Sequence, residues 1–248
     1  ISSYNFIKLV SFEAYNCIFK YDLICLIETY LDSSFPVDDI SLNLKGYNLI
    51  RADYPLNVKS GGVCVYYKDT LPIKVLNISQ LPECLVLEIL YDDKKCFITS
   101  LYRSPSQTSD EFETFLTKFE QLVDSIYSLD PYLFIIFGDF NAKLSSWNVN
   151  DPDTFEGKKI DELTSSYGLS QIISEPTHIL PTSSSCIDLI FCNQPNLIID
   201  SGAHSSLHEN CHHQIIFAKI IFNIHVPPPY ERHIWHYTRG NVDLIKVL

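Results

Sequence analysis

The sequence predicts an α+β protein in which two mixed β-sheets pack face to face and helices flank them. Short apolar runs of strand length recur along most of the chain, and helical segments interrupt them. Some neighbouring runs are separated by turn residues alone, which indicates antiparallel hairpins. The chain has 248 residues, 46% of them hydrophobic, which is enough to bury one large core. We therefore expect one domain over residues 1–222.

The first half of the chain is expected to supply most of the strands. Apolar residues recur at helical spacing over residues 6–17, and the apolar run at residues 22–28 is typical of a buried strand that ends at Glu28. Four further runs have strand composition, and they lie at residues 46–53, 61–68, 84–93 and 95–104. The Gly61-Gly62 pair marks a tight turn, and the Asp92-Asp93 pair makes the last two runs a hairpin.

The second half alternates helices and strands. Residues 109–128 predict an amphipathic helix with Ser109 as its N-cap, and a buried strand follows at residues 134–140. A shorter helix is expected to end at Gly168. Two more strands are expected, at residues 185–193 and 212–222. Three consecutive prolines and a polar, aromatic sequence predict that residues 223–248 are an exit linker toward a following region.

Composition limits the classes of function. A net charge of −12 disfavours binding to nucleic acid through a broad basic surface, although a metal site can bring its own positive charge. No apolar run is long enough to span a bilayer and no signal peptide begins the chain, so we expect an intracellular protein without membrane contact. The eight cysteines lack a C-x-x-C pair, which favours reduced thiols over structural zinc. The absence of methionine, including an initiator, predicts a piece of a longer polypeptide.

Polar residues follow the apolar runs at several strand ends, where a rigid sheet can direct side chains into one cleft. They are Glu28, Tyr102, Asp139, Asn141, Asp188, His212 and His213. Taken singly, most of them fit ordinary surface or packing positions. The exception is the segment from Gly138 to Asn141, where a buried run delivers an acid and an amide two positions apart, on one side of an extended chain.

Five segments occur in an order that is found in one family. They are LICLIETYLDSS, SLYRSPS, FIIFGDFNA, EPTHILPTSSSCIDLIF and CHHQIIF, and they extend from residue 22 to residue 222. The chain resembles the endonuclease/exonuclease/phosphatase superfamily, which includes apurinic endonucleases and pancreatic deoxyribonuclease. It resembles more closely the endonuclease domain of non-LTR retrotransposon polyproteins, because of the Y-R-x-P and S-x-I-D-L forms. The resemblance implies the four-layer α/β sandwich of pancreatic deoxyribonuclease.

The resemblance also implies a function. It predicts a Mg²⁺-dependent phosphodiesterase, with Mn²⁺ as a substitute, that acts as a DNA endonuclease. The enzyme would nick target DNA for retrotransposition, leaving a 3′-hydroxyl that primes a reverse transcriptase region of the same polypeptide. The target DNA would be its partner, and the nucleus its place of action. A carboxylate site of this kind suits Mg²⁺, which prefers hard oxygen ligands.

Roles for individual residues follow from the same resemblance. Glu28 would hold Mg²⁺, Asp139 would orient or deprotonate the attacking water, and Asn141 would fix Asp139 and the phosphate. Tyr102 would donate to a phosphate oxygen. A histidine of CHHQIIF would contact the phosphate while Asp188 holds its other ring nitrogen, which raises the pKa of the histidine.

Two further residues have open interpretations. Arg103 fits a contact to the DNA phosphate about as well as a solvated surface position. Trp147 could touch the DNA groove, but a packed core position is the ordinary one for a tryptophan.

The chain departs from the family pattern at two places. The family ends on Ser-Asp-His, and an ungapped alignment places Cys211, His212 and His213 there, which favours His213 as the catalytic histidine and leaves His212 as a weaker metal ligand. A shift by one residue would instead select His212. At the start, Asn5 matches a metal-site asparagine, yet only four residues precede it, so the first strand is expected to be clipped and the activity impaired.

Two other functions stay open. The chain could be a phosphatase or lipid phosphodiesterase of the same superfamily. It could also be a catalytically impaired remnant or an interaction module, which the clipped start and the missing carboxylate would favour.

Overall fold

The predicted fold class is confirmed, with a six-stranded mixed sheet as its main layer. The computed structural model describes residues 21–31, 42–53, 61–91, 93–206 and 211–221. The six strands, in spatial order, are β4 (Ile73–Leu76), β5 (Cys84–Tyr91), β6 (Lys94–Tyr102), β7 (Leu133–Asp139), β11 (Asp188–Cys192) and β8 (Ser170–Gln171). The β6 and β7 strands pair in parallel, and the other neighbours pair antiparallel.

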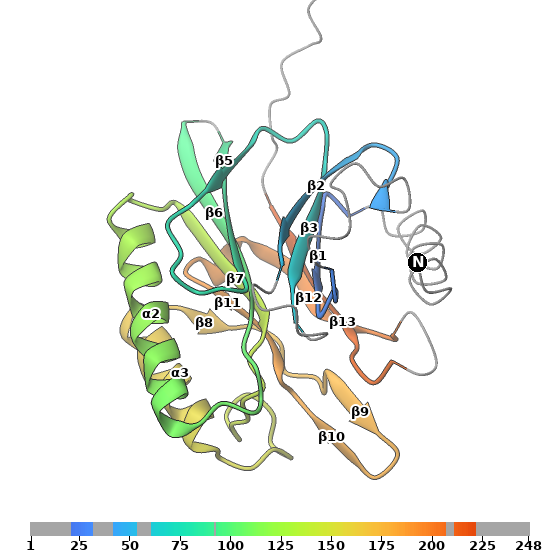
Figure 1. The fold of residues 1–248 in the computed structure, drawn as a ribbon, viewed down its shortest axis with the longest axis vertical. Coiled ribbons are helices and arrows are strands. Elements are labelled where there is room, and N and C mark those ends of the chain that lie inside the picture. Colours follow the sequence, from blue (N-terminus) through green and yellow to red (C-terminus); the bar gives the residue numbers. More distant parts are fainter. Residues whose placement is uncertain (1–20, 32–41, 54–60, 92, 207–210, 222–248) are drawn as a thin grey trace, which may run out of the picture.

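A second layer of strands faces this sheet (Figure 1). It contains the antiparallel strands β1 (Leu23–Ile27), β3 (Val63–Lys68) and β2 (Tyr47–Ala52), in that spatial order, and the pair β12 (Ile198–His204) and β13 (Ile215–Ile220). Side chains of β3 such as Val63 and Val65 join the same core cluster as Leu85 and Leu87 of β5. The two layers are therefore held together by apolar packing, which stabilises a sandwich.

Two helices cover the outer face of the six-stranded sheet (Figure 1). They are α2 (Ser109–Tyr127) and α3 (Phe155–Ser166). The N-cap of α2 is Thr108, not the predicted Ser109: its hydroxyl accepts the N–H of Glu111, and the Glu111 carboxylate accepts the N–H of Thr108. This reciprocal pair satisfies two free donors at once, which explains why the helix begins at Ser109, one residue earlier than predicted.

Aromatic side chains connect the helical layer to the sheet. Phe119 of α2 packs edge to face on Phe140 at 5.9 Å between ring centroids, and Phe140 packs in the same way on Phe191 of β11 at 5.2 Å. All three rings are fully buried. The end of β7 is therefore held from both sides by packed rings, and this part of the molecule is a rigid support for the residues that follow.

A small hairpin extends away from the sandwich. It consists of β9 (His178–Leu180) and β10 (Ser183–Ser185), and a short 3₁₀ helix (Pro195–Leu197) precedes β12. Figure 1 shows the hairpin projecting from the end of the molecule where β7 finishes. Among the described residues, neither α-helix combines the length and apolar character that crossing a membrane requires.

The predicted strands from residue 22 to residue 193 are confirmed, and the hairpin turn at Asp92-Asp93 is confirmed by the pairing of Tyr91 with Lys94. The last strand begins at Ile215, not at residue 212. The sequence did not predict β4, β8, β9, β10 or β12, which are short or interrupted by polar residues. The helix expected at residues 6–17, Asn5, the clipped first strand and the linker at 223–248 lie outside the described residues.

Candidate active site

Three of the predicted site residues stand in one row across the six-stranded sheet. The pairing of β6 with β7 places Tyr102 opposite Asp139, and the pairing of β7 with β11 places Asp139 opposite Asp188. Register fixes this row, because a slip of one residue would turn every side chain to the other face. The strand ends thus direct a phenol and two carboxylates toward one point.

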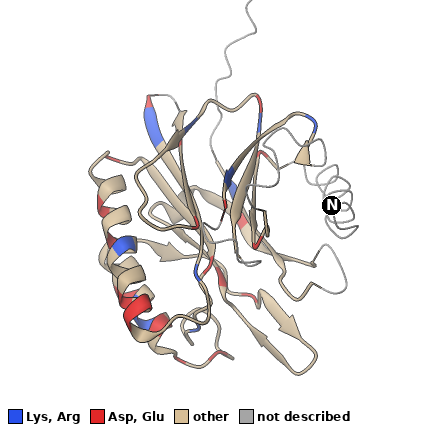
Figure 2. Ribbon diagram, in the orientation of Figure 1, with Lys and Arg blue, Asp and Glu red and all other residues tan. Residues whose placement is uncertain are grey.

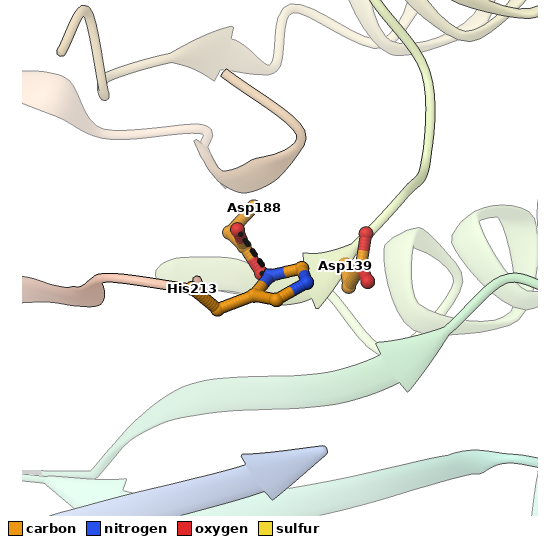
Figure 3. A group of neighbouring side chains, drawn as sticks. All are labelled: Asp139, Asp188 and His213. Atoms are coloured by element: carbon orange, nitrogen blue, oxygen red, sulfur yellow. Dashed lines mark hydrogen bonds and ion pairs between the residues drawn. The ribbon is translucent and has the colours of Figure 1, made fainter. Parts of the chain in front are cut away.

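Asp139, Asp188 and His213 form a compact group at that point (Figure 3). One ligand atom from each lies within 4.8 Å of the others. His213 Nδ1 lies 3.0 Å from Asp188 Oδ2 and 3.2 Å from its Oδ1. Asp139 and Asp188 are 4% and 8% exposed. The Asp188 carboxylate therefore orients the ring of His213, leaving the other ring nitrogen free to face a ligand.

The electrostatics of the group favour a bound proton or cation. Burial and the nearby charge of Asp188 raise the pKa of Asp139. The hydrogen bond with Asp188 raises the pKa of His213, so its imidazolium form is favoured at neutral pH. The charge of Glu28 contributes in the same direction to both shifts. Negative charge is thus concentrated in a partly dehydrated site, and such concentration is common where catalysis takes place.

Asn141 supports Asp139 through its main chain. The N–H of Asn141 donates to Asp139 Oδ1 at 2.9 Å, and its side-chain amide donates to the carbonyl of Arg103 at 2.8 Å. The sequence analysis expected an extended chain here. The structure differs, because Asn141 has a left-handed backbone with φ of +46°. Asparagine tolerates that conformation better than most residues. The sharp turn brings the amide N–H back to the carboxylate that precedes it.

Arg103 has neither of its two expected positions. It is 3% exposed, so it is not a solvated surface residue. Its Nε donates to the carbonyl of Phe140, and its Nη2 donates to the carbonyl of Asn141 at 2.7 Å. Its Nη1 donates to Gln107 Oε1 at 3.0 Å and to the carbonyl of Ser104 at 3.2 Å. The planar guanidinium holds the turn that carries Asp139 and Asn141.

Glu28 reaches the site from the other layer. It follows β1, and its Oε1 accepts the hydroxyl of Tyr102 at 2.8 Å. The hydroxyl of Tyr30 donates to Oε2 at 3.3 Å. Burial and the contact with Glu28 raise the pKa of Tyr102, which keeps the phenol protonated as a donor. The Tyr102 hydroxyl thus contacts Glu28 here, where the sequence analysis expected it to donate to a phosphate.

The comparisons with known proteins agree with this geometry. A family model described as endonuclease-reverse transcriptase matches residues 96–216, which include Tyr102, Asp139, Asp188 and His213. The endonuclease domain of TRAS1, a telomere-specific non-LTR retrotransposon, aligns over 86% of this chain and 92% of its own, with 16% identity and a TM-score of 0.69. The chain has the fold of the endonuclease/exonuclease/phosphatase superfamily.

Other solved structures of this fold belong to proteins that are named for different activities. The apurinic endonuclease LMAP of Leishmania major aligns over 85% of this chain and 82% of its own, with 12% identity and a TM-score of 0.67. A mannosyl-6-phosphatase, Bt3783 of Bacteroides thetaiotaomicron, aligns over 88% and 91%, with 13% identity and a TM-score of 0.59. No curated protein sequence matches the chain. The likeness to these structures shows the fold that they share and does not decide the reaction or the substrate of this chain.

The structure distinguishes the two adjacent histidines, His212 and His213. His213 bonds to Asp188, which is the register that the sequence analysis favoured. His212 is exposed, and its ring centroid lies 6.1 Å from that of His178, outside the group formed by Asp139, Asp188 and His213. The structure therefore does not bring His212 to the position of a metal ligand in that group. Asn5, the other weaker ligand, lies outside the described residues.

Trp147 is a core residue. It is 5% exposed, its Nε1 donates to Asp161 Oδ1 at 3.0 Å, and its ring packs edge to face on Phe191 at 6.0 Å. The packed alternative thus describes its position, and the ring is not available to a DNA groove.

Sequence reasoning missed two residues beside the site. The Thr177 hydroxyl accepts the N–H groups of Ile187 at 3.1 Å and Asp188 at 2.9 Å, and Thr177 is fully buried. The ring of His178 lies 4.7 Å from that of His213, between centroids. Both residues belong to the quoted segment EPTHILPTSSSCIDLIF, but nothing in a sequence marks a threonine as the anchor of a strand eleven residues away.

Proposed function

We propose that this chain is a Mg²⁺-dependent DNA endonuclease domain that nicks one strand of a target site and leaves a 3′-hydroxyl for reverse transcription. The observation that carries the proposal is the row of Tyr102, Asp139 and Asp188, completed by His213 and, through Tyr102, by Glu28. Acid, base and cation-binding groups converge there, as phosphodiester cleavage requires. The likeness to the TRAS1 endonuclease domain supports DNA as the substrate.

The donor set fits a hard divalent cation. Glu28 and Asp139 offer carboxylate oxygens, which Mg²⁺ prefers, and Mn²⁺ can use the same ligands. Burial and the negative charges of Asp188 and Glu28 raise the pKa of Asp139, and a cation would offset those charges. When bound, the cation would neutralise the scissile phosphate and stabilise the leaving oxygen. The imidazole of His212 is not needed for such a site.

The residues of the chain divide the remaining tasks. His213, held at Nδ1 by Asp188, presents its other N–H to a phosphate oxygen as an imidazolium. Asp139 orients the attacking water and accepts its proton, and the main-chain N–H of Asn141 fixes the carboxylate for this task. Tyr102 keeps Glu28 in place. Each role places a preorganised group where charge develops during the reaction.

The distribution of charged residues is consistent with brief contact with DNA. Figure 2 shows acidic and basic segments mixed along the helices and strands of the described residues, and blue is not gathered on one face. With a net charge of −12, DNA would be held at the site itself, by the cation and a few donors. The proposal includes action in the nucleus, a domain over residues 1–222, and a linker at 223–248 toward a reverse transcriptase region.

Nicking of supercoiled plasmid by the purified chain tests the proposal. We expect nicking with Mg²⁺ or Mn²⁺ and none with a chelator. His213→Ala should lower the rate by about 10²-fold or more, the scale for removing one group that stabilises the transition state. His212→Ala is the matched control, because it removes the same side chain one position away, and it should leave the rate within about 3-fold of the unmodified chain.

Two alternative functions are outcomes of the same experiment. Hydrolysis of a soluble phosphomonoester without plasmid nicking would reject the endonuclease and favour a superfamily phosphatase, an activity that the Bacteroides structure carries. A folded chain that binds no Mg²⁺ and turns over neither substrate would reject an enzyme altogether. It would favour a remnant or an interaction module.

A further inference from the structure

The main chain around Glu28 is in an unfavourable conformation. Glu28 has φ of +55° and Tyr30 has φ of +53°. Residues other than glycine, asparagine and aspartate seldom adopt this left-handed region, because it is sterically unfavourable for them. Neighbouring structure must therefore hold the segment. This matters for the site, because the same backbone angle aims the Glu28 carboxylate at Tyr102.

The Gly61-Gly62 turn holds the segment by main-chain bonds. The N–H of Thr29 donates to the carbonyl of Gly62 at 3.2 Å, and the N–H of Tyr30 donates to the carbonyl of Gly61 at 3.0 Å. Both glycines are left-handed themselves, with φ of +81° and +87°. A turn of two glycines has much conformational freedom of its own. It can fix Glu28 only if something else fixes the turn.

Glu83 is the side chain that fixes the turn. It precedes β5, is 5% exposed, and its Oε1 accepts the N–H of Gly62 at 2.6 Å. The carboxylate lies directly against Gly61, since a Cβ added there would come within 1.9 Å of Glu83 Oε1. Burial, and to a smaller extent the negative charge of Glu28, raise the pKa of Glu83. The sequence analysis gave Glu83 no role.

Glu83 also connects to the other partner of Glu28. Its main-chain carbonyl accepts the N–H of Tyr102 at 3.0 Å, and the Tyr102 hydroxyl donates to Glu28. One residue thus contacts the turn that holds the backbone after Glu28 and the strand end that holds its carboxylate. Glu83 is thus connected to Glu28 in two ways, to its backbone through the glycine turn and to its carboxylate through Tyr102.

We infer that Glu83 is a positioning residue for the cation-binding carboxylate Glu28, acting through its hydrogen bond to the Gly61-Gly62 turn. The inference rests on the proposed function, in which Glu28 holds Mg²⁺. Outer partners of metal ligands commonly contribute 10–100-fold to metal affinity. The role depends on a side chain long enough to bring an acceptor oxygen to the N–H of Gly62, and not on the negative charge of that side chain. This distinction makes the inference testable.

Two conservative substitutions separate reach from charge. Glu83→Gln keeps an oxygen at the same distance but removes the charge, whereas Glu83→Asp keeps the charge and shortens the side chain by about 1.5 Å. Titration calorimetry with Mg²⁺ should show Kd raised by about 10-fold or more in Glu83→Asp and unchanged within about 3-fold in Glu83→Gln. The Mg²⁺ concentration for half-maximal nicking should follow the same order, while the rate at saturating Mg²⁺ changes little.

Val86→Ala is the control for simple loss of stability. Val86 is buried in the same strand, so its truncation weakens the fold without touching the turn. Its Kd for Mg²⁺ should equal that of the unmodified chain. Equal Kd values in Glu83→Asp and the unmodified chain would overturn the inference, and a loss confined to Glu83→Gln would indicate an effect of charge instead. An equal loss in both Glu83 variants would also overturn it, because the length of the side chain does not explain a loss in Glu83→Gln. If the unmodified chain itself neither binds Mg²⁺ nor nicks DNA, the proposed function fails, and the role of Glu83 in Mg²⁺ binding fails with it.

Discussion

Asp188 and His213 are joined at 3.0 Å between Oδ2 and Nδ1, although 25 residues separate them in the chain. Asp188 begins β11, and Thr177 fixes the main chain at that point by accepting its N–H. His213 comes from the segment before β13, which pairs with His178 through a single β-bridge. Two different elements thus bring the pair together, and its geometry depends on both.

The first prediction concerns this pair and pH. Asp188 raises the pKa of His213, so Asp188→Asn should lower that pKa toward the ordinary value of histidine. The imidazolium would then be lost at lower pH. In nicking assays at saturating Mg²⁺, the alkaline limb of the pH profile should move to lower pH, and the rate should fall by about 10²-fold or more. An alkaline limb that stays in place would show that His213 does not act in its charged form.

The second prediction is that the ionised carboxylate of Asp139 destabilises the fold. The pKa of Asp139 is raised, so the folded protein binds this proton more tightly than the unfolded chain. Stability from this group is then greatest below the unfolded pKa of about 3.9 and is lost as pH rises toward the folded pKa. Asp139→Asn removes this loss of stability and keeps a side-chain oxygen that can accept the N–H of Asn141.

Melting temperatures measured in chelator test this second prediction. Asp139→Asn should melt above the unmodified chain, and the difference should grow between about pH 5 and about pH 8. Nicking should be lost in the same variant. A difference that shrinks with rising pH would contradict the sign of the shift. Asp153→Asn is the control, because Asp153 is exposed and lies outside β7. Its difference in melting temperature from the unmodified chain should not grow with pH.

The third prediction concerns Arg103. Its guanidinium donates to the carbonyls of Phe140 and Asn141 at once, which a lysine ammonium cannot reproduce in that planar geometry. Arg103→Lys should lower the free energy of unfolding by about 2 kcal/mol, because a buried acceptor loses its partner. Urea unfolding measures the loss. Lys159→Ala removes only an exposed ion pair with Glu162, and a similar loss there would refute the special role of Arg103.

The fourth prediction concerns the glycine before Asp139. A Cβ on Gly138 would lie 2.5 Å from the carbonyl oxygen of Leu101, in the strand paired in parallel with β7. Gly138→Ala should therefore separate the ends of β6 and β7 and displace Tyr102 from Asp139. We expect a lower melting temperature and, at temperatures where the variant is folded, weaker Mg²⁺ binding. Unchanged Mg²⁺ binding in the folded variant would mean that the row of side chains tolerates the shift.

The sequence by itself determined the class of the fold and most of the site. Apolar runs of strand length mark buried strands because hydrophobic burial acts on composition, which is local. For the same reason Glu28, Tyr102, Asp139 and Asp188 could be recognised as polar residues at strand ends. The ordered family segments added the superfamily and the choice of His213 over His212, which the bond to Asp188 supports.

Only the tertiary structure decided how those residues are held. Whether Arg103 is solvated or buried, and whether Asn141 supports Asp139 through its side chain or its main chain, depends on which carbonyls come near. The same holds for Thr177 and Glu83, whose partners lie 11 and 21 residues away. Hydrogen-bond partners of buried polar groups are set by strand register and by turns with left-handed residues. These are properties of the assembled sheets, and a local pattern of residues does not contain them.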